Sequence, residues 1–186
     1  MKGRMKKEIL KEAFTPILHP YQATIITTVS KQKRPNAIAI AWIIPVSIKP
    51  PALAFAIRKQ RFTYKLLKEV PEFVVNIVPF ELAKETEYVG SVSGVSCNKL
   101  KDAKLKTENA EIVLPPVIKK SIAHIECRVK EIVDLSLDHV IIVGEVLKAF
   151  ADNDIFEKRW KVKDAKLLLH LGGSYFTTNA SRKIKV

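Results

Sequence analysis

The chain has few cysteines and few glycines, and each shortage argues against a class of protein. Its two cysteines, Cys97 and Cys127, cannot form a framework of several disulfides, and their spacing matches no zinc-binding pattern. A reducing compartment is therefore expected. The six glycines include no G-x-G-x-x-G run after a predicted strand, so a parallel dinucleotide-binding sheet is not expected. Internal repeats and low-complexity segments are missing too.

Long hydrophobic runs are also missing from the sequence. The longest, residues 37–46, is too short to span a bilayer and contains Pro45. The N-terminal residues 1–14 are basic, but they include Glu8 and Glu12 and lack an apolar core, so a signal peptide is not expected. These absences predict a cytoplasmic protein with no membrane partner.

Acidic residues are in the minority, since 19 Asp and Glu stand against 32 Lys and Arg and give a net charge of +13. Such an excess is typical of a nucleic-acid surface, and it would also attract anionic cofactors or acidic protein partners. Many of the cations lie near the two ends of the chain. Abundant Lys and Ile with few Gln and Cys also fit a heat-adapted source. We therefore favour a solvated, thermophile-like surface over a specific site for a polyanion.

The apolar content of the sequence is sufficient for one core. A hydrophobic fraction of 47% over 186 residues predicts a single domain spanning residues 1–186. Two segments are expected at its periphery. One is an N-terminal helical extension over residues 1–14, with a short helix at residues 7–14, and the other is a lysine-rich surface excursion over residues 101–120.

Alternating apolar and polar residues predict a series of β-strands. The expected strands are residues 23–30, 36–44, 52–58, 72–78, 122–133 and 139–147. Prolines at 45, 50 and 51 interrupt the pattern after the strand expected at residues 36–44. The strand at 122–133 is expected to place Ile125, Cys127 and Val129 on one face and Glu126 among the polar residues of the other.

In two segments the hydrophobic residues recur with the period of a helix. Residues 60–70 predict a helix with Thr63 as its N-cap, and residues 81–89 predict a second one. With seven or so strands, few helices and no regular strand–helix alternation, the fold class is expected to be mainly β. A closed antiparallel barrel with short helical additions is the architecture that fits this pattern best.

Three residues from separate segments would form a phosphate site if the fold brought them together. Arg58 offers a planar donor fork and Lys99 a point charge, and the hydroxyl of Thr63 would complete the site at a helix start. Considered alone, Arg58 and Lys99 are equally well explained as surface residues, and Thr63 as a helix cap. Ser93, in a polar loop with Gly94, could add a hydrogen bond or simply form the loop.

Three further segments suggest one assembled site for a flat, phosphorylated heterocycle. They are residues 36–42, with Asn36 and Trp42, residues 138–146, with His139, and residues 170–175, with His170. The small residues of the first would let a flat group approach the backbone. Core packing for Trp42 and turn chemistry for Asn36 remain alternatives. None of the four histidines has zinc spacing or belongs to a Ser–His–Asp order, so neither a metal site nor a triad is expected.

Taken in order, these segments resemble the flavin reductase-like family of FMN-binding split barrels, which includes flavoredoxins and NAD(P)H:flavin oxidoreductases. The resemblance extends over residues 23–175 and rests on the order and spacing of its motifs. The motifs are ATIITTVS, NAIAIAW, PVSIKPPALAFAIRKQRFTYKLLKEVPEFVVNIV, VSGVSCNKL, DHVIIVGEV and HLGGSY. The chain departs from the family at Asn98-Lys99-Leu100, where an acidic residue followed by Lys-Phe is common.

The resemblance implies a six-stranded antiparallel split β-barrel of Greek-key type, assembled as a homodimer with FMN near the dimer interface. It assigns Asn36 and the backbone of Ile40, Ala41 and Trp42 to the isoalloxazine ring. The phosphate and ribityl chain fall to Arg58, Thr63, Ser93 and Lys99. His139 would lie near the flavin, and His170 with Tyr175 would lie on the nicotinamide or flavin side, so that these three are the expected catalytic residues.

The function expected from this resemblance is that of an FMN-dependent oxidoreductase. It would pass electrons from NADH or NADPH to free flavin, iron(III) or a protein. The alternative is a flavoredoxin-like carrier that another protein reduces. A third hypothesis, a basic nucleic-acid-binding barrel, needs exposed aromatic residues among the lysines, whereas Trp42, Phe55 and Phe73 lie in apolar strands. The sequence leaves open which nicotinamide is used, how tightly flavin is held, and the role of Cys97.

Overall fold

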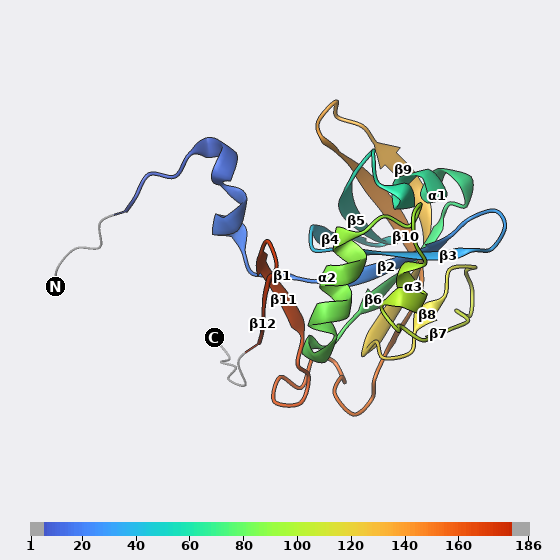
Figure 1. Cartoon of the computed structure of the whole chain (residues 1–186). Coiled ribbons are helices and arrows are strands. Elements are labelled where there is room, and N and C mark those ends of the chain that lie inside the picture. The colour runs from blue at the N-terminus through green and yellow to red at the C-terminus, as the bar shows by residue number, and fades with distance from the viewer. Residues whose placement is uncertain (1–5, 180–186) are drawn as a thin grey trace.

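The centre of this computed structural model, which describes residues 6–179, is a seven-stranded antiparallel sheet (Figure 1). The strand order is β3-β2-β6-β9-β10-β5-β4. In chain order the strands are β2 (Thr24–Val29), β3 (Pro35–Ile40), β4 (Ile43–Ile48), β5 (Pro51–Arg58), β6 (Glu72–Ile77), β9 (Ala123–Val133) and β10 (His139–Ala151). The strands expected at residues 23–30, 52–58, 72–78, 122–133 and 139–147 are confirmed, with shifts of a few residues at their ends, whereas the strand expected at residues 36–44 divides into β3 and β4.

The sheet differs from the closed barrel that the strand pattern predicted and from the six strands that the family resemblance implied. It has seven strands, and among the described residues no ladder joins its two edges, β3 and β4. Only Ala41 and Trp42 connect these edges along the chain, so Ile40 and Ile43 lie within about 11 Å of each other at full extension. The sheet must therefore curl until its edges almost meet, which produces a barrel that is split between β3 and β4.

The prolines do not end the strand where the sequence suggested. The break falls at Ala41 and Trp42, and β4 then runs through Pro45. An edge strand tolerates proline because its outward N–H has no partner to lose. The ladder between β4 and β5 also shifts its register between Pro45 and Ser47, which removes the proline from regular pairing.

The main core lies inside the curled sheet. Phe55 of β5 and Phe73 of β6 meet edge to face at 5.3 Å between ring centroids, and both are buried. Gly144 of β10 is required here, because a Cβ at that position would lie 2.4 Å from Cζ of Phe73. The ladder between β10 and β9 shifts its register beside Gly144.

Short helices cover one outer face of the sheet (Figure 1). The helical elements of the body are α1 (Phe62–Glu69), η3 (Phe80–Leu82), α2 (Ala83–Ser91) and α3 (Lys99–Asp102). Val89 of α2 and Leu100 of α3 belong to a second apolar cluster with Ile25 and Ala37 of the sheet. This cluster holds α2 and α3 against β2 and β3, where the candidate site forms.

A second, three-stranded sheet combines segments from both ends of the described chain. It has the order β1-β11-β12, with β1 (Tyr21–Gln22), β11 (Leu168–Gly172) and β12 (Tyr175–Thr178). Two 3-10 turns precede it, η1 (Lys11–Ala13) and η2 (Thr15–Leu18), and neither buries a residue. The expected helix over residues 7–14 is therefore reduced to one such turn, and residues 1–5 lie outside the described part. No helix within residues 6–179 is long and apolar enough to cross a membrane.

Residues 103–122, which we call the strap, are not the surface excursion that was expected. Leu105, Val113, Val117 and Ile118 are buried. The strap contains the strands β7 (Thr107–Glu108) and β8 (Val117–Ile118), which pair with each other. Its apolar residues contact the outer face of the main sheet, where Val113 and Val117 pack with Val74 of β6.

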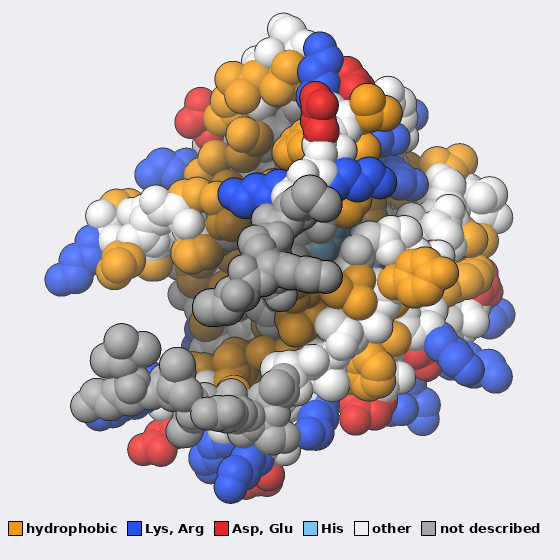
Figure 2. Space-filling model, turned by 90° about the vertical axis from the view of Figure 1, so that its left-hand side faces the viewer, with side chains coloured by type: hydrophobic (Ala, Val, Ile, Leu, Met, Phe, Trp, Pro, Cys, Tyr) orange, Lys and Arg blue, Asp and Glu red, His pale blue; other side chains and the backbone are white. Residues whose placement is uncertain are grey.

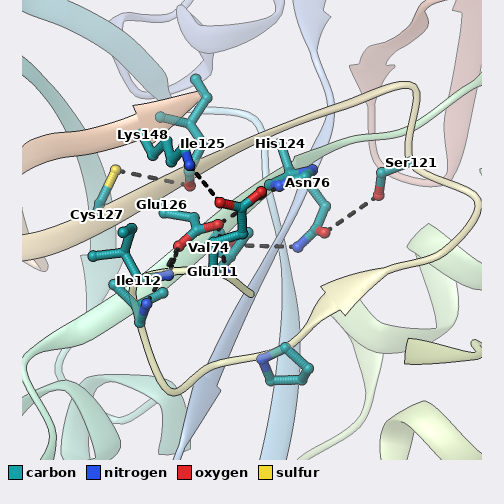
Figure 3. Close-up of polar contacts among 12 residues, drawn as sticks. Val74, Asn76, Glu111, Ile112, Ser121, His124, Ile125, Glu126, Cys127 and Lys148 are labelled. Carbon is teal, nitrogen blue, oxygen red and sulfur yellow. Dashed lines mark hydrogen bonds and ion pairs between the residues drawn. The ribbon is translucent and has the colours of Figure 1, made fainter. Parts of the chain in front are cut away.

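Glu126 of β9 fastens the strap (Figure 3). It was expected at the solvent face of its strand, but its side chain is fully buried. Its carboxylate accepts hydrogen bonds from the backbone N–H groups of Glu111 at 2.9 Å, Ile112 at 2.6 Å and Val113 at 3.3 Å. The simple alternation fails because the strap covers this face, and the buried carboxylate is satisfied by N–H donors that the strap supplies.

Candidate functional site

Two adjoining cavities lie where α1, α2 and α3 meet the edges of the sheet. Ile38, Arg58 and Arg61 contribute to both. The first, which we call the cationic cavity, has a volume of about 610 Å³ and also contains Lys99, Thr63, Ser93 and Asp138. The second, the alanine-lined cavity, has a volume of about 640 Å³ and contains Ala39, Ala41, Trp42, His139 and His170.

The cationic cavity is built around the start of α1. Arg58 ends β5, and the N–H of Arg61 donates to the Arg58 carbonyl at 3.0 Å, which turns the chain into the helix. Arg61, rather than Thr63, occupies the N-cap position, and no side chain caps this helix. Thr63 is wrong as a cap, but it lines the cavity from the first turn of the helix and is buried.

Asn36 supports the cavity from behind and is absent from the residues that line either one. Its side chain is buried, and its Nδ2 donates to the Thr63 hydroxyl at 2.9 Å. Its Oδ1 lies 2.1 Å from the point where Gly94 would carry a Cβ. Asn36 therefore fixes Thr63 and requires glycine at 94, which brings the 92–98 loop close to β3.

Lys99 is the innermost cation of the site. Only 6% of the residue is exposed, and its Nζ donates to the carbonyl of Val89 at 2.7 Å. Burial, together with the nearby charge of Arg61, lowers the pKa of Lys99 to about 8, while Cys97 opposes the shift. An anion in the cavity would compensate this buried charge.

The structure brings together Arg58, Thr63 and Lys99, which the sequence assigned to a phosphate, and Ser93, which it offered as a further donor. Binding of a phosphate by these residues stays a prediction. Sequence reasoning missed Arg61, which lines both cavities. A signal existed, since Arg61 ends a basic run that begins at Arg58 and lies at the start of the helix predicted over residues 60–70.

The alanine-lined cavity lies beside the break between β3 and β4. Ile40, Ala41 and Trp42 pass between the two edges of the sheet and line it together, as the sequence suggested. Ala39 and Ala56 also line this cavity, and their small side chains take up little of its space. Small side chains at these positions leave room for a flat group against the backbone.

His139 stands at the junction of the two cavities. It is the first residue of β10 and pairs with Arg58 across the ladder to β5. Its Nδ1 lies 2.9 Å from Oδ1 of Asp138, and its ring is 5.0 Å from that of Trp42 with the planes tilted by 40°. The contact with His139 is the main cause that lowers the pKa of the Asp138 carboxyl, and the charge of Arg58 adds to it.

His170 enters the alanine-lined cavity from β11. Its Nε2 lies 2.8 Å from the carbonyl oxygen of Gly173, across a turn in which Gly172 and Gly173 have φ values of 109° and 54°. Only glycine adopts such values without strain. Tyr175, by contrast, is 76% exposed and lines neither cavity. Its neighbour Phe176 lines the cavity instead, because successive residues of a strand face opposite sides.

The two cavities together suit a flat group joined to an anion. One end offers three cations with hydroxyl donors, and the other offers low walls with two imidazoles. The Nδ1 atoms of both His139 and His170 are buried without a hydrogen-bond partner. Within the described residues 6–179, no three His, Cys, Asp or Glu side chains come close enough to hold a metal ion.

Comparison with known proteins extends these observations. The model of the flavin reductase-like domain family matches residues 18–179. An uncharacterized protein of Archaeoglobus fulgidus is 34% identical over 169 residues, which cover 90% of this chain and 93% of that one. A flavin reductase (NADH) of Kitasatospora aureofaciens is 28% identical over 128 residues, which cover 69% of this chain and 64% of that one.

Solved structures show the same fold. A flavoredoxin from Methanosarcina acetivorans matches with a TM-score of 0.85 at 24% identity, over 98% of this chain and 95% of that one. An FMN-binding protein from Thermus thermophilus, solved with bound 1-cyclohex-2-enone, matches with a TM-score of 0.84 at 21% identity over the whole of both chains. The architecture is therefore the split barrel of FMN-binding proteins.

Proposed function

The chain belongs to the flavin reductase-like family, and we propose that it is an FMN-dependent oxidoreductase that takes electrons from a nicotinamide dinucleotide. The observation that carries this proposal is the pair of adjoining cavities, one cationic and one lined by small residues. Their chemistry matches the two ends of FMN, a phosphate dianion and a flat ring.

The cationic cavity would hold the phosphate. Arg58 offers a planar donor fork, while Arg61 and Lys99 add positive charge. Thr63 and Ser93 can donate hydroxyl hydrogen bonds from the opposite walls. A phosphate would also offset the cost of burying the Lys99 ammonium.

The alanine-lined cavity would hold the isoalloxazine ring against Ile40, Ala41 and Trp42. The bound flavin would supply the two-electron redox chemistry. The side chains of this chain would bind and orient the reactants, and none of them needs to act as a nucleophile. His139 and His170 place imidazole rings at the ring end of the site, where we assign them to orienting the ring and the electron donor.

The electron donor is proposed as NADH or NADPH. Similarity to a protein named flavin reductase (NADH) supports this class of donor. Free flavin, an iron(III) complex or a protein remains the proposed acceptor. Stacking a nicotinamide on the ring requires the alanine-lined cavity to stay open on one side, and its exposed rim at Glu87, Ser174 and Gly173 offers polar groups to such a second ligand.

A second candidate function is that of a flavoredoxin-like electron carrier, which the similarity to a flavoredoxin favours. The net charge of +13 would then attract an acidic redox partner. On the face that Figure 2 shows, Lys and Arg side chains are spread around the surface with hydrophobic side chains between them. This distribution fits general attraction of acidic proteins better than one focused site.

We further propose a homodimer, supported by an apolar row on the edge strand β4. Ile44, Val46 and Ile48 lie along this strand and are 62%, 48% and 87% exposed, and the register shift between Pro45 and Ser47 turns Ile48 to the face opposite Ile44. Large apolar side chains exposed on an edge strand mark an interface. Trp42 continues the row and also lines the alanine-lined cavity, so a second copy on β4 would lie beside the proposed flavin ring.

An absorbance spectrum of the purified protein, repeated without oxygen after NADH and then NADPH, tests the proposal. Flavin bands that bleach rapidly with either nucleotide support the reductase and name its donor. Bands that persist with both nucleotides but bleach with dithionite support the carrier. If reconstitution with FMN gives no flavin bands, both functions are wrong.

A further inference from the structure

One carboxylate, that of Asp138, contacts a functional residue of each cavity. Its Oδ2 lies 3.7 Å from Nη2 of Arg58, and its Oδ1 lies 2.9 Å from Nδ1 of His139. Arg58 lines both cavities, His139 lines the alanine-lined cavity, and Asp138 itself lines the cationic one. No other acidic residue lines the cationic cavity, so this contact is the internal competitor for its cations among the described residues.

The two contacts differ in kind. The contact with His139 is the closer one, at 2.9 Å, but Nδ1 of His139 is buried without a hydrogen-bond partner, so the two groups meet without hydrogen-bond geometry. The contact with Arg58 is a longer ion pair whose two side chains are 57% and 72% exposed. Such a pair is weak, and a phosphate dianion can take over the guanidinium fork. The carboxylate, released from Arg58, would then be free to accept a hydrogen bond from Nδ1 of His139 and to hold the imidazole beside Trp42.

We propose that Asp138 is a positioning residue that couples the two cavities. It weakens binding of a phosphate at Arg58, and it holds His139 in the orientation that electron transfer at the ring requires. This inference rests on the proposed function, because it assigns the anion to the flavin phosphate. It goes further because it assigns two opposite effects to the Asp138 side chain: weaker binding of the phosphate and better orientation of His139. A purely structural residue would not show such opposite effects.

The test is Asp138→Asn, which keeps the size of the side chain and removes its charge. FMN should bind about fivefold more tightly, the size of one exposed charge interaction, and the gain should shrink with added salt. Riboflavin, which lacks the phosphate, should bind as tightly to the variant as to the wild type. Reduction of bound flavin by the nicotinamide should slow by about tenfold or more, because the imidazole is misplaced.

Asp134→Asn provides a matched control. Asp134 lies in the same connection between β9 and β10, and it pairs with Lys59 at 2.5 Å. It lines neither cavity. This variant should change neither the preference for FMN over riboflavin nor the rate of reduction.

A readout without turnover separates this inference from the proposed function. The emission of Trp42, measured in a Trp160→Phe background, reports the position of the neighbouring His139 ring, and Asp138→Asn should alter it. Unchanged emission, or FMN and riboflavin affinities that change together, would overturn the coupling. Wild-type protein that binds FMN but takes no electrons from either nicotinamide would overturn the reductase alone, since binding and emission still decide the role of Asp138.

Discussion

At the scale of single residues, the site divides between charge at one end and imidazole at the other. Arg58 and Lys99 line the cationic cavity, while His139 and His170 line the alanine-lined cavity. This separation predicts that substitutions at the two ends have different effects. The physical reason is that a phosphate contact contributes to binding in every state, whereas an orienting contact matters mainly during reaction.

Arg58→Ala or Lys99→Ala should weaken retention of FMN by about tenfold or more, since each removes a charge-assisted contact. His139→Ala or His170→Ala should slow turnover and change FMN affinity little. Fluorescence titration and stopped-flow reduction, made on the same four variants, separate the two effects. Equal loss of FMN from all four would show that the division of roles is wrong.

The buried Lys99 also predicts a pH dependence. Its pKa in the folded chain is lowered from 10.5 to about 8, so between these values the unfolded chain binds more protons and stability should rise with pH. Bound phosphate should raise this pKa again. FMN binding near pH 8 should therefore take up protons, which calorimetry in two buffers of different ionisation enthalpy measures. Lys99→Met should abolish both the uptake and this part of the stability profile.

At the scale of elements, the strap and its anchors decide how the outer face of the sheet is closed. Glu126 binds three successive N–H groups of the strap, and Glu72 accepts from Leu114 at 2.9 Å. Asn76 accepts from the backbone of Ile118 at 2.8 Å. Buried acceptors on the sheet therefore satisfy a segment that contains little secondary structure of its own (Figure 3).

Glu126→Gln should lower the free energy of unfolding by about 2–3 kcal/mol, because a neutral amide replaces a charged acceptor of backbone N–H groups. No residue of the strap lines either cavity, so FMN affinity should change little. Urea unfolding measures the loss of stability. Glu131→Gln, an exposed carboxylate on the same strand, is the control and should remain within about 0.5 kcal/mol of the wild type.

At the scale of the whole molecule, the split of the barrel matters most. The chain passes between the open edges at Ala41 and Trp42, and the same residues line the cavity and continue the apolar row on β4. The proposed ring site and the proposed dimer surface therefore lie next to each other. Any loss of the dimer should then also affect the flavin.

Ile48→Lys should shift the protein from dimer to monomer, since it places a charge in the apolar row on β4. Light scattering after size-exclusion chromatography measures the mass of both forms. Ile112→Lys, which changes another exposed isoleucine on the strap, should leave the mass unchanged. Wild-type protein that is already a monomer at micromolar concentration would contradict the proposed assembly.

The sequence by itself determined the strands, the helices α1 and α2, and the family, because alternation and motif order are local properties that a chain carries in its pattern. It also named Arg58, Thr63, Ser93 and Lys99, which the fold brings to one cavity. Glu126 shows where the local pattern failed. It was placed by period alone, whereas the strap sets its surroundings. Tyr175 was placed by its motif, and the β12 pairing sets its surroundings.

Only the tertiary structure decided which residues meet. Arg61 lines both cavities because α1 begins beside the edge of the sheet. Asn36 lies behind the site because Thr63 and Gly94 pack against it. The pairing of Arg58 with His139 across β5 and β10 places Asp138 in contact with both side chains. Contacts between residues distant in sequence depend on how the sheet curls, and no short segment of the chain encodes that curvature.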